Sequence, residues 1–232
     1  MTRRAREFRA VFFDLDGTLV DIHGPLYNAA RGAIDSLGIE PPLTRERYRE
    51  SLARGDLWLG VPEHLRRDYM QLALAYFLAE IDRTERLEVL PHVGETLAEL
   101  KRRDYATGVI TSRPGDPQTL VKKLAMVGLA SHLDFVITQT SVSLTALDKT
   151  ESLRDAAMRA AVLPAACMYV GDEPRDTMAA MGAGYGAAVS VATGPVSYQG
   201  LSDHEHFRPD FVMRSMGELL ALLEHLREAE ET

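Results

Sequence analysis

Short apolar runs, rich in β-branched and aromatic residues, alternate along this chain with segments in which apolar residues recur every three or four positions. The runs lie at residues 10–13, 106–110, 135–138, 168–171 and 187–191, with a weaker one at 211–213. Short runs of this kind, bounded by polar turns, are typical of strands buried on both faces of a sheet. Their alternation with helical segments favours a parallel sheet covered by helices on both faces. We therefore predict a Rossmann-like, three-layer α/β core.

The segment between the first two apolar runs has no strand pattern. Its spacing predicts helices at residues 25–37, 45–53 and 63–81. Pro25 suits the start of the first of these helices and Gly38 suits its end. An all-helical block inside an α/β chain is typical of an inserted domain. We therefore predict a catalytic core made of residues 1–18 and 91–232, and a helical cap domain at residues 19–90.

Composition and charge narrow the class of protein. With 46% hydrophobic and 26% charged residues among 232, the chain has the composition of an ordinary globular protein. Its net charge of −8 argues against a nucleic-acid partner, because an acidic chain repels polyanions. The single cysteine, Cys167, excludes an intramolecular disulfide, which fits a reducing cytoplasm. The sequence carries no pattern that predicts an oligomeric state.

The sequence shows no pattern typical of a membrane or secreted protein. The chain has no run of about 18 apolar residues, so we expect no membrane span and no membrane partner. A basic segment, residues 1–9, opens the chain, but Asp14 and Asp16 interrupt the apolar stretch that would follow it in a signal peptide. We interpret the basic segment as a short solvated leader and expect a cytoplasmic protein.

Polar residues gather directly after several of the predicted strands. They are Asp14 and Asp16 after the first run, Thr111 and Ser112 after the second, Asp172, Glu173 and Asp176 after the fourth, and Lys149 before the helix that leads into the fourth. In an open parallel sheet the site lies beyond the carboxyl ends of the strands. We therefore expect these side chains to converge on one edge of the sheet.

The residue types favour metal-assisted phosphate chemistry. Clustered carboxylates repel one another unless a cation lies among them, and Mg²⁺ prefers such hard oxygen ligands. The same ion would offset the charge of a phosphate. A carboxylate nucleophile beside a metal, with a second carboxylate two residues on, is what an aspartyl-phosphate intermediate needs. A hydroxyl and a lysine could hold the phosphoryl oxygens as their charge shifts in the transition state.

Four motifs resemble those of the haloacid dehalogenase superfamily, in the family's order. The sequence FDLDGTLVD at residues 13–21 is similar to the first motif, Thr111-Ser112 to the second, Lys149 to the third, and GDEPRD at residues 171–176 to the fourth. The resemblance extends over nearly the whole chain. It implies a hydrolase with a Rossmann-like core, a bound Mg²⁺ and a helical cap of the C1 type.

The resemblance also implies a role for each residue. Asp14 would be the nucleophile and a metal ligand, and Asp172 would be a further metal ligand. Asp16 would act as general acid and then as base, and its backbone carbonyl would bind the metal. Thr111 and Ser112 would bind the phosphoryl oxygens, Lys149 would neutralise the nucleophile and the phosphate, and Asp176 would hold metal-bound water or Lys149. Family members that cleave carbon–halogen bonds lack the second acidic residue, so Asp16 favours the phosphatase branch.

Two positions depart from the family's pattern. Thr150 follows Lys149 where many relatives carry proline, and Glu173 lies where a small hydroxyl residue is common. Glu173 adds a negative charge near the predicted metal, either as a solvated residue of the first helical turn or as an acceptor for metal-bound water.

The predicted substrate is a small phosphorylated metabolite, such as a sugar phosphate, a phosphoglycolate-like acid or a nucleoside monophosphate. A phosphomutase with the same residues remains an alternative, as does a non-catalytic binding or regulatory protein. Phosphonate cleavage would need a lysine in the cap, and residues 19–90 contain none. Arg54, His64 and Arg66 in the cap could contact the substrate, although solvation at the surface is the simpler interpretation.

Overall fold

A computed structural model describes residues 7–139, 148–204 and 208–228 of the chain. Residues 1–6 of the expected leader lie outside the described residues. Six parallel strands form one sheet in the order β3-β2-β1-β4-β5-β6. They are β1 (Ala10–Phe13), β2 (Ala106–Pro114), β3 (Phe135–Gln139), β4 (Cys167–Gly171), β5 (Ala187–Val191) and β6 (Phe211–Met213). All six predicted strands are present, and the predicted α/β fold class is confirmed.

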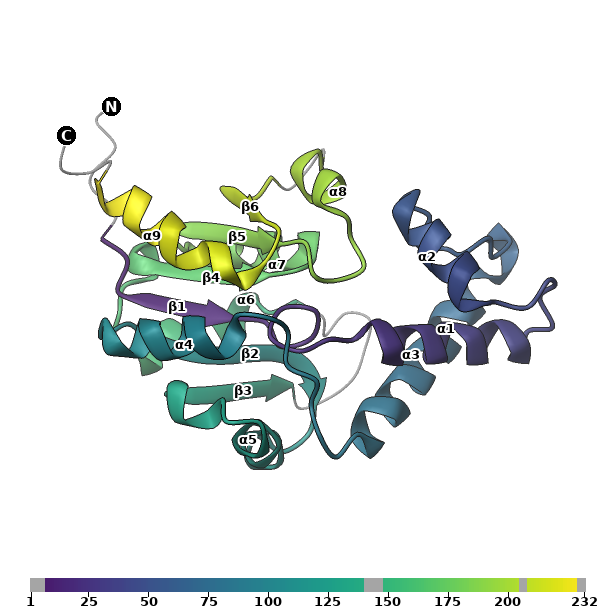
Figure 1. Cartoon of the computed structure of the whole chain (residues 1–232), viewed down its shortest axis with the longest axis horizontal. Helices are drawn as coiled ribbons and strands as arrows, with labels where there is room; N and C mark the ends of the chain where they lie inside the picture. The colour runs from purple at the N-terminus through teal and green to yellow at the C-terminus, as the bar shows by residue number, and fades with distance from the viewer. Residues whose placement is uncertain (1–6, 140–147, 205–207, 229–232) are drawn as a thin grey trace.

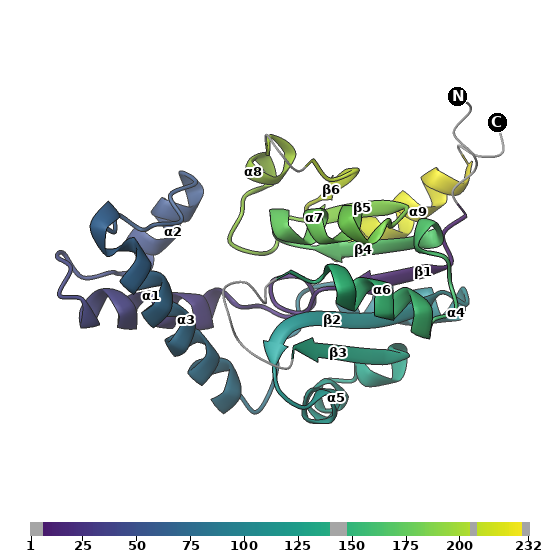
Figure 2. The same ribbon diagram turned by 180° about the vertical axis from the view of Figure 1, so that it is seen from behind.

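Helices cover both faces of the sheet (Figures 1 and 2). On one face lie α4 (Val93–Arg102), α5 (Pro117–Met126) and α9 (Leu219–Glu228); on the other lie α6 (Thr150–Arg159) and α7 (Pro174–Ala183). Successive side chains of a strand point to opposite faces. Val11 and Phe13 accordingly pack with the first group of helices, while Ala10 and Phe12 pack with the second. Since both faces of β1 are fully buried, its sequence reads as a continuous apolar run.

Between β1 and α4 the described helices are α1 (His23–Ser36), α2 (Arg45–Ala53) and α3 (Arg66–Arg83), with a short 3-10 turn at Glu63–Leu65 before α3. We refer to residues 19–90 as the cap segment. It has its own cluster of buried side chains, which includes Tyr27, Ile34 and Tyr69. The strand arrows point toward α1, α2 and α3, so these helices lie beyond the carboxyl ends of the strands (Figure 1).

Two helix boundaries differ from the sequence prediction. The helix α1 begins at His23, so that Pro25 lies within its first turn, where a missing N–H costs no helical hydrogen bond. The predicted helix at residues 63–81 is divided into a 3-10 turn and α3. Gly38, which was predicted to end α1, has a φ of +62° just beyond it, and this left-handed conformation suits glycine.

The strand β2 is longer than predicted. The sequence indicates an end at Ile110, whereas β2 continues to Pro114 and includes Thr111 and Ser112. Its pairing with β1 ends at Val109, and its register with β3 shifts between Ile110 and Pro114. The last residues of β2 therefore extend past the end of β1, at the carboxyl edge of the sheet where the polar residues gather. None of the helices in the described ranges combines the length and apolar character that a bilayer crossing requires.

Candidate active site

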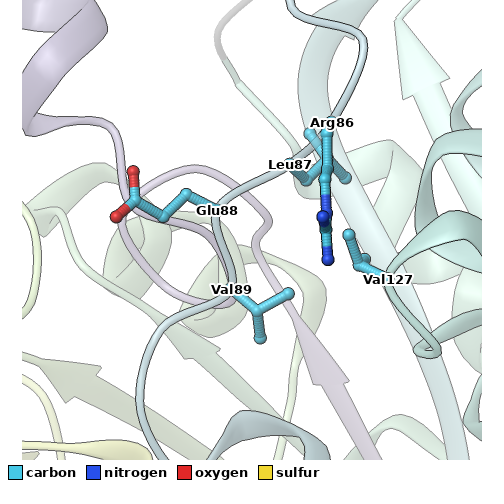
Figure 3. A pocket seen from close by; sticks show the side chains of 5 residues that line it. All are labelled: Arg86, Leu87, Glu88, Val89 and Val127. Carbon is cyan, nitrogen blue, oxygen red and sulfur yellow. The ribbon is translucent and has the colours of Figure 1, made fainter.

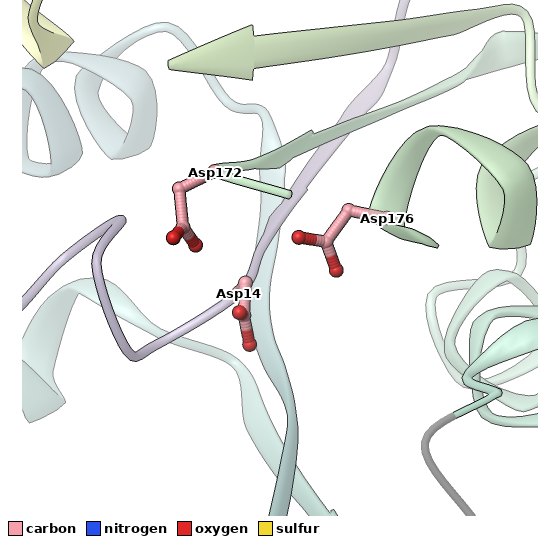
Figure 4. Close-up of side chains that lie close together, drawn as sticks. All are labelled: Asp14, Asp172 and Asp176. Atoms are coloured by element: carbon pink, nitrogen blue, oxygen red, sulfur yellow. The ribbon is translucent and has the colours of Figure 1, made fainter. Parts of the chain in front are cut away.

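Three aspartates meet at the carboxyl edge of the sheet. Asp14 follows β1, and its backbone N–H donates to the carbonyl of Val170 in β4 at 2.9 Å. Asp172 follows β4, and Asp176 lies in the first turn of α7. Their carboxylates point toward one another (Figure 4), and a ligand atom of each lies within 4.8 Å of the others. All three side chains are buried, so their charges need partners other than water.

A buried lysine supplies one of these partners. The Nζ of Lys149 lies 2.7 Å from Asp14 Oδ1 and 2.8 Å from Asp176 Oδ1. It also donates to the Tyr169 hydroxyl at 3.2 Å, which in turn donates to the carbonyl of Ile110 at 2.9 Å. Burial lowers the pKa of Lys149, but the two carboxylates outweigh it and raise that pKa well above its usual value. The lysine is therefore charged and fixed beside the predicted nucleophile.

The Asp172 carboxylate keeps one oxygen open. Its Oδ1 accepts a hydrogen bond from the Thr18 hydroxyl at 3.2 Å. Its Oδ2 is buried, and no described residue donates a hydrogen bond to it. A Cβ atom added at Gly17 would lie 2.4 Å from this Oδ2, and one added at Gly194 would lie 1.8 Å from it. The two glycines thus leave space around an unpartnered carboxylate oxygen, which is the environment that a cation ligand requires.

Asp176 has both oxygens held by the protein. Its Oδ2 accepts the backbone N–H of Glu173 at 3.1 Å, as part of the capping box of α7, and its Oδ1 accepts from Lys149. Asp14 and Asp172 are therefore the better metal ligands, and Asp176 positions Lys149. Glu173 is the N-cap of α7 and is partly buried, with its Oε2 at 2.5 Å from Arg175 Nε. The interpretation of Glu173 as a solvated first-turn residue is therefore wrong.

The side chain of Asp16 does not join the three aspartates. Its two oxygens accept from Nη2 and Nε of Arg113 at 2.6 and 2.7 Å, a bidentate pair that is mostly shielded from water. The backbone N–H of Arg113 also donates to the Thr111 hydroxyl at 3.1 Å. Arg113 and Arg175 were not among the site residues predicted from the sequence. Both lie within or next to motif residues, which was the signal that could have identified them.

The pKa values of the carboxylates show what burial costs. Burial raises the pKa of Asp14 from 3.8 to about 7, although the charge of Lys149 opposes the rise. Burial, with the nearby charge of Glu173, raises the pKa of Asp172 well above its usual value. A bound cation would favour the ionised form of both groups. The donor set of two buried carboxylates, one with an unpartnered oxygen, therefore fits a hard divalent metal.

A cavity of about 350 Å³ lies between the sheet edge and the cap segment. The core lines it with Asp14, Asp16, Thr111, Ser112, Arg113, Lys149, Glu173, Arg175 and Pro195. The predicted phosphoryl-binding residues thus share one cavity with the predicted nucleophile. Arg54, His64 and Arg66 do not line it. A second cavity, of about 490 Å³, lies at residues 86–89 and Val127 and includes none of the candidate residues (Figure 3).

Comparisons with known proteins point to one family. The model of the family described as haloacid dehalogenase-like hydrolase matches residues 8–184. The phosphoglycolate phosphatase of Synechococcus elongatus is 29% identical over 223 residues, which cover 94% of this chain and 98% of that protein. The pyrophosphatase PpaX of Bacillus velezensis is 28% identical over 223 residues, which cover 91% of this chain and 94% of that protein.

Solved structures resemble the fold. A haloacid dehalogenase-like hydrolase of Streptococcus pneumoniae superposes with a TM-score of 0.68 at 21% identity, over 93% of this chain and 98% of that chain. The parallel sheet with helices on both faces and further helices beyond its carboxyl edge is therefore a fold that other proteins share.

Proposed function

The chain belongs to the haloacid dehalogenase-like hydrolases and is a phosphatase of that family, and we propose that it hydrolyses a small phosphate monoester with Mg²⁺ through an aspartyl-phosphate on Asp14. The observation that carries the proposal is the buried group of Asp14, Asp172 and Lys149 beside a cavity. A divalent metal is typical of the family. Mg²⁺ is proposed because the donors are hard oxygens and the substrate is a phosphate.

We assign the metal to Asp14, Asp172 and the backbone carbonyl of Asp16. When bound, Mg²⁺ would offset the charges of the carboxylates and of the phosphate and so allow the two to meet. Lys149 would also offset the negative charge of Asp14 and of the phosphate, because its Nζ lies 2.7 Å from Asp14 Oδ1. Asp176 holds Lys149 at that position, 2.8 Å from its own Oδ1.

The first chemical step uses Asp14 and Asp16. A carboxylate oxygen of Asp14 attacks phosphorus, and the bond between phosphorus and the leaving oxygen breaks. Asp16 gives its proton to that oxygen, so an alcohol leaves and the phosphoryl group remains on Asp14. Thr111 and Ser112 line the cavity beside Asp14 and would donate to the phosphoryl oxygens during transfer.

The second step reverses the role of Asp16. The now ionised Asp16 takes a proton from water as the water oxygen attacks phosphorus. The bond between phosphorus and Asp14 breaks, inorganic phosphate leaves, and both side chains return to their starting forms. Asp16 is paired with Arg113 in this structure, so Arg113 must release it when the leaving group enters.

We further propose that residues 19–90 act as a cap domain over a core of residues 1–18 and 91–232. The cap segment forms its own buried cluster and contributes one wall of the cavity. Movement of such a lid would admit the substrate and exclude water while the aspartyl-phosphate exists. The described part of the chain has no helix fit to cross a membrane, and we propose a cytoplasmic location.

The test is release of inorganic phosphate from a panel of phosphate monoesters, with Mg²⁺ and then with excess EDTA. We expect release that depends on the metal and falls at least about a hundredfold in EDTA. Formation of an isomer without free phosphate would instead indicate the phosphomutase. No reaction with any ester would contradict the enzymatic proposal and favour a binding or regulatory protein.

A pH dependence of metal binding follows from Asp14. Its pKa rises from 3.8 to about 7 in the folded protein, so its proton stabilises the metal-free fold at low pH, and this contribution is lost as pH rises through about 7. A cation must displace that proton below pH 7. Mg²⁺ at a hundredfold excess over its Kd should raise Tm by roughly 5–10 °C at pH 8, and clearly less at pH 6.

The measurement is thermal unfolding in EDTA and in Mg²⁺ at both pH values. Asp172→Asn is the control, since it removes one proposed ligand and should abolish the metal-dependent shift. Equal shifts at pH 6 and pH 8 would show that Asp14 does not release a proton to the metal.

A further inference from the structure

The cap wall of the cavity is apolar except for the hydroxyl groups of two tyrosines. Every lining residue that the cap segment contributes is aliphatic or aromatic, including Leu52, Leu57, Met70, Leu74, Phe77 and Leu78. From this wall we infer that the substrate is the phosphate ester of an apolar alcohol, alkyl or arylalkyl, without a second charged group. The inference rests on the proposed phosphatase function and specifies its leaving group.

Two features of the cap wall favour a binding surface over a packed core. Leu57 is 48% exposed and Met70 is 40% exposed, although both are large apolar residues that line the cavity. Large apolar side chains exposed together mark binding surfaces. Closure of the cap directly onto the core would press this wall against charged residues such as Asp16 and Arg113, which is unfavourable. A molecule with a phosphate at one end and an apolar body fits both walls.

Tyr48 and Tyr69 are the cap residues in this lining that carry a polar side-chain atom. Both rings are buried in the cap, and burial raises the pKa of each to about 12. They are therefore neutral at physiological pH and offer no charge to a substrate. A sugar phosphate has several hydroxyl groups that need partners when they leave water, and these two phenols would leave most of them without one.

The charged lining residues are already paired with one another. Arg113 holds Asp16, Arg175 holds Glu173, and Lys149 holds Asp14. Among the described residues that line the cavity, three cations thus face three anions. A carboxylate or second phosphate on the leaving group would have to compete with Asp16 for Arg113 or with Glu173 for Arg175, and burying it unpaired would be costly.

The leaving group inferred here differs in charge from those that the relatives' names imply. Glycolate and phosphate, the leaving groups that the names phosphoglycolate phosphatase and pyrophosphatase imply, are both anionic. The cavity of about 350 Å³ falls in the range of small-molecule sites, roughly 300–1,000 Å³. It would hold a short alkyl chain or one ring beside the phosphoryl group.

The first experiment compares alkyl phosphates from methyl to hexyl with phosphoglycolate, glycerol phosphate and glucose 6-phosphate, all with Mg²⁺. The alkyl series keeps the leaving-group chemistry nearly constant while apolar area increases. We expect kcat/KM to rise about threefold to fourfold for each methylene group until the cavity is filled. Hexyl phosphate should exceed phosphoglycolate by at least about tenfold.

The second experiment changes the wall itself. Met70→Arg adds a cation at a partly exposed position in the cavity and should lower kcat/KM for hexyl phosphate at least about tenfold. It should also raise kcat/KM for phosphoglycolate. Leu57→Arg, on a different part of the cap, should act in the same direction. Gln71→Arg is the matched control, since it adds the same charge to an exposed neighbour that does not line the cavity.

A binding measurement separates recognition from turnover. Hexylphosphonate, which cannot be hydrolysed, should raise Tm of the wild-type protein in Mg²⁺ more than phosphonoacetate does, and Met70→Arg should reverse that order. A flat alkyl series, or a preference for phosphoglycolate, would overturn this inference while leaving the phosphatase in place. Absence of phosphate release from every ester would overturn the proposed function, and this inference with it.

Discussion

Replacement of Asp14 by asparagine is expected to lower kcat by roughly 10⁴-fold or more while the fold persists. The amide is nearly the same size as the carboxylate, so the buried site keeps its packing. An amide oxygen is far less nucleophilic, and no aspartyl-phosphate can form from it. Lys149 keeps its second partner, since Asp176 Oδ1 remains 2.8 Å from its Nζ.

Three measurements test this variant. Phosphate release gives kcat, thermal unfolding reports the fold, and acid quenching during turnover should trap phosphate on the wild-type protein but not on Asp14→Asn. Asp155→Asn is the matched control, because that carboxylate pairs with Arg159 at the surface, away from the site, and kcat should stay within about twofold. Turnover above about 1% of wild type, in a sample free of deamidated protein, would remove Asp14 as the nucleophile.

The sheet was predictable because its strands are buried on both faces. Where neighbouring strands and two helical layers exclude water, nearly every residue is apolar, as in β1 and β5. The sequence could not give the order β3-β2-β1-β4-β5-β6, which depends on how the crossovers pack. That order puts β1 between β2 and β4, and it explains why Asp14 lies beside residues about 100 and 160 positions away in the chain.

The residues of the site could be predicted from the sequence, but several of their contacts could not. Asp14 and Asp172 follow adjacent strands and Thr111 lies in the last part of a third, so the convergence of the carboxyl ends brings them together. The pairing of Asp16 with Arg113 was not visible, since it depends on β2 continuing four residues past Ile110. A strand end is a weak signal in sequence, because polar residues at the edge of a sheet look like a loop.

The roles of Glu173 and of the cap wall could not be predicted from the sequence for a different reason. The sequence left Glu173 as a solvated first-turn residue or an acceptor for metal-bound water. That it is the N-cap depends on the exact residue at which α7 begins, which the sequence does not specify. The apolar residues of the cap look like ordinary core residues. Whether Leu57 or Met70 faces a cavity or a neighbouring helix depends on how α2 and α3 pack, which periodicity alone does not decide.

Replacement of Lys149 by methionine is expected to have a double effect. It should lower the free energy of unfolding of the metal-free protein by about 3–5 kcal/mol at pH 8, because Asp14 and Asp176 would remain buried without their cation. It should also lower kcat about 10²- to 10³-fold, the usual effect of removing one group that stabilises transition-state charge. Methionine has a similar length and volume, so the loss of packing is small.

The pH dependence of that variant distinguishes charge from packing. Protonation of the unpaired carboxylates removes the electrostatic cost, so the destabilisation should be smaller at pH 5 than at pH 8, and Mg²⁺ should restore part of the stability at pH 8. Lys101→Met is the matched control: its ammonium pairs with Asp134 at 2.6 Å at the surface, and its loss should cost less than about 1 kcal/mol. A destabilisation that does not change with pH would assign Lys149 a packing role, and kcat near the wild-type value would separate it from catalysis.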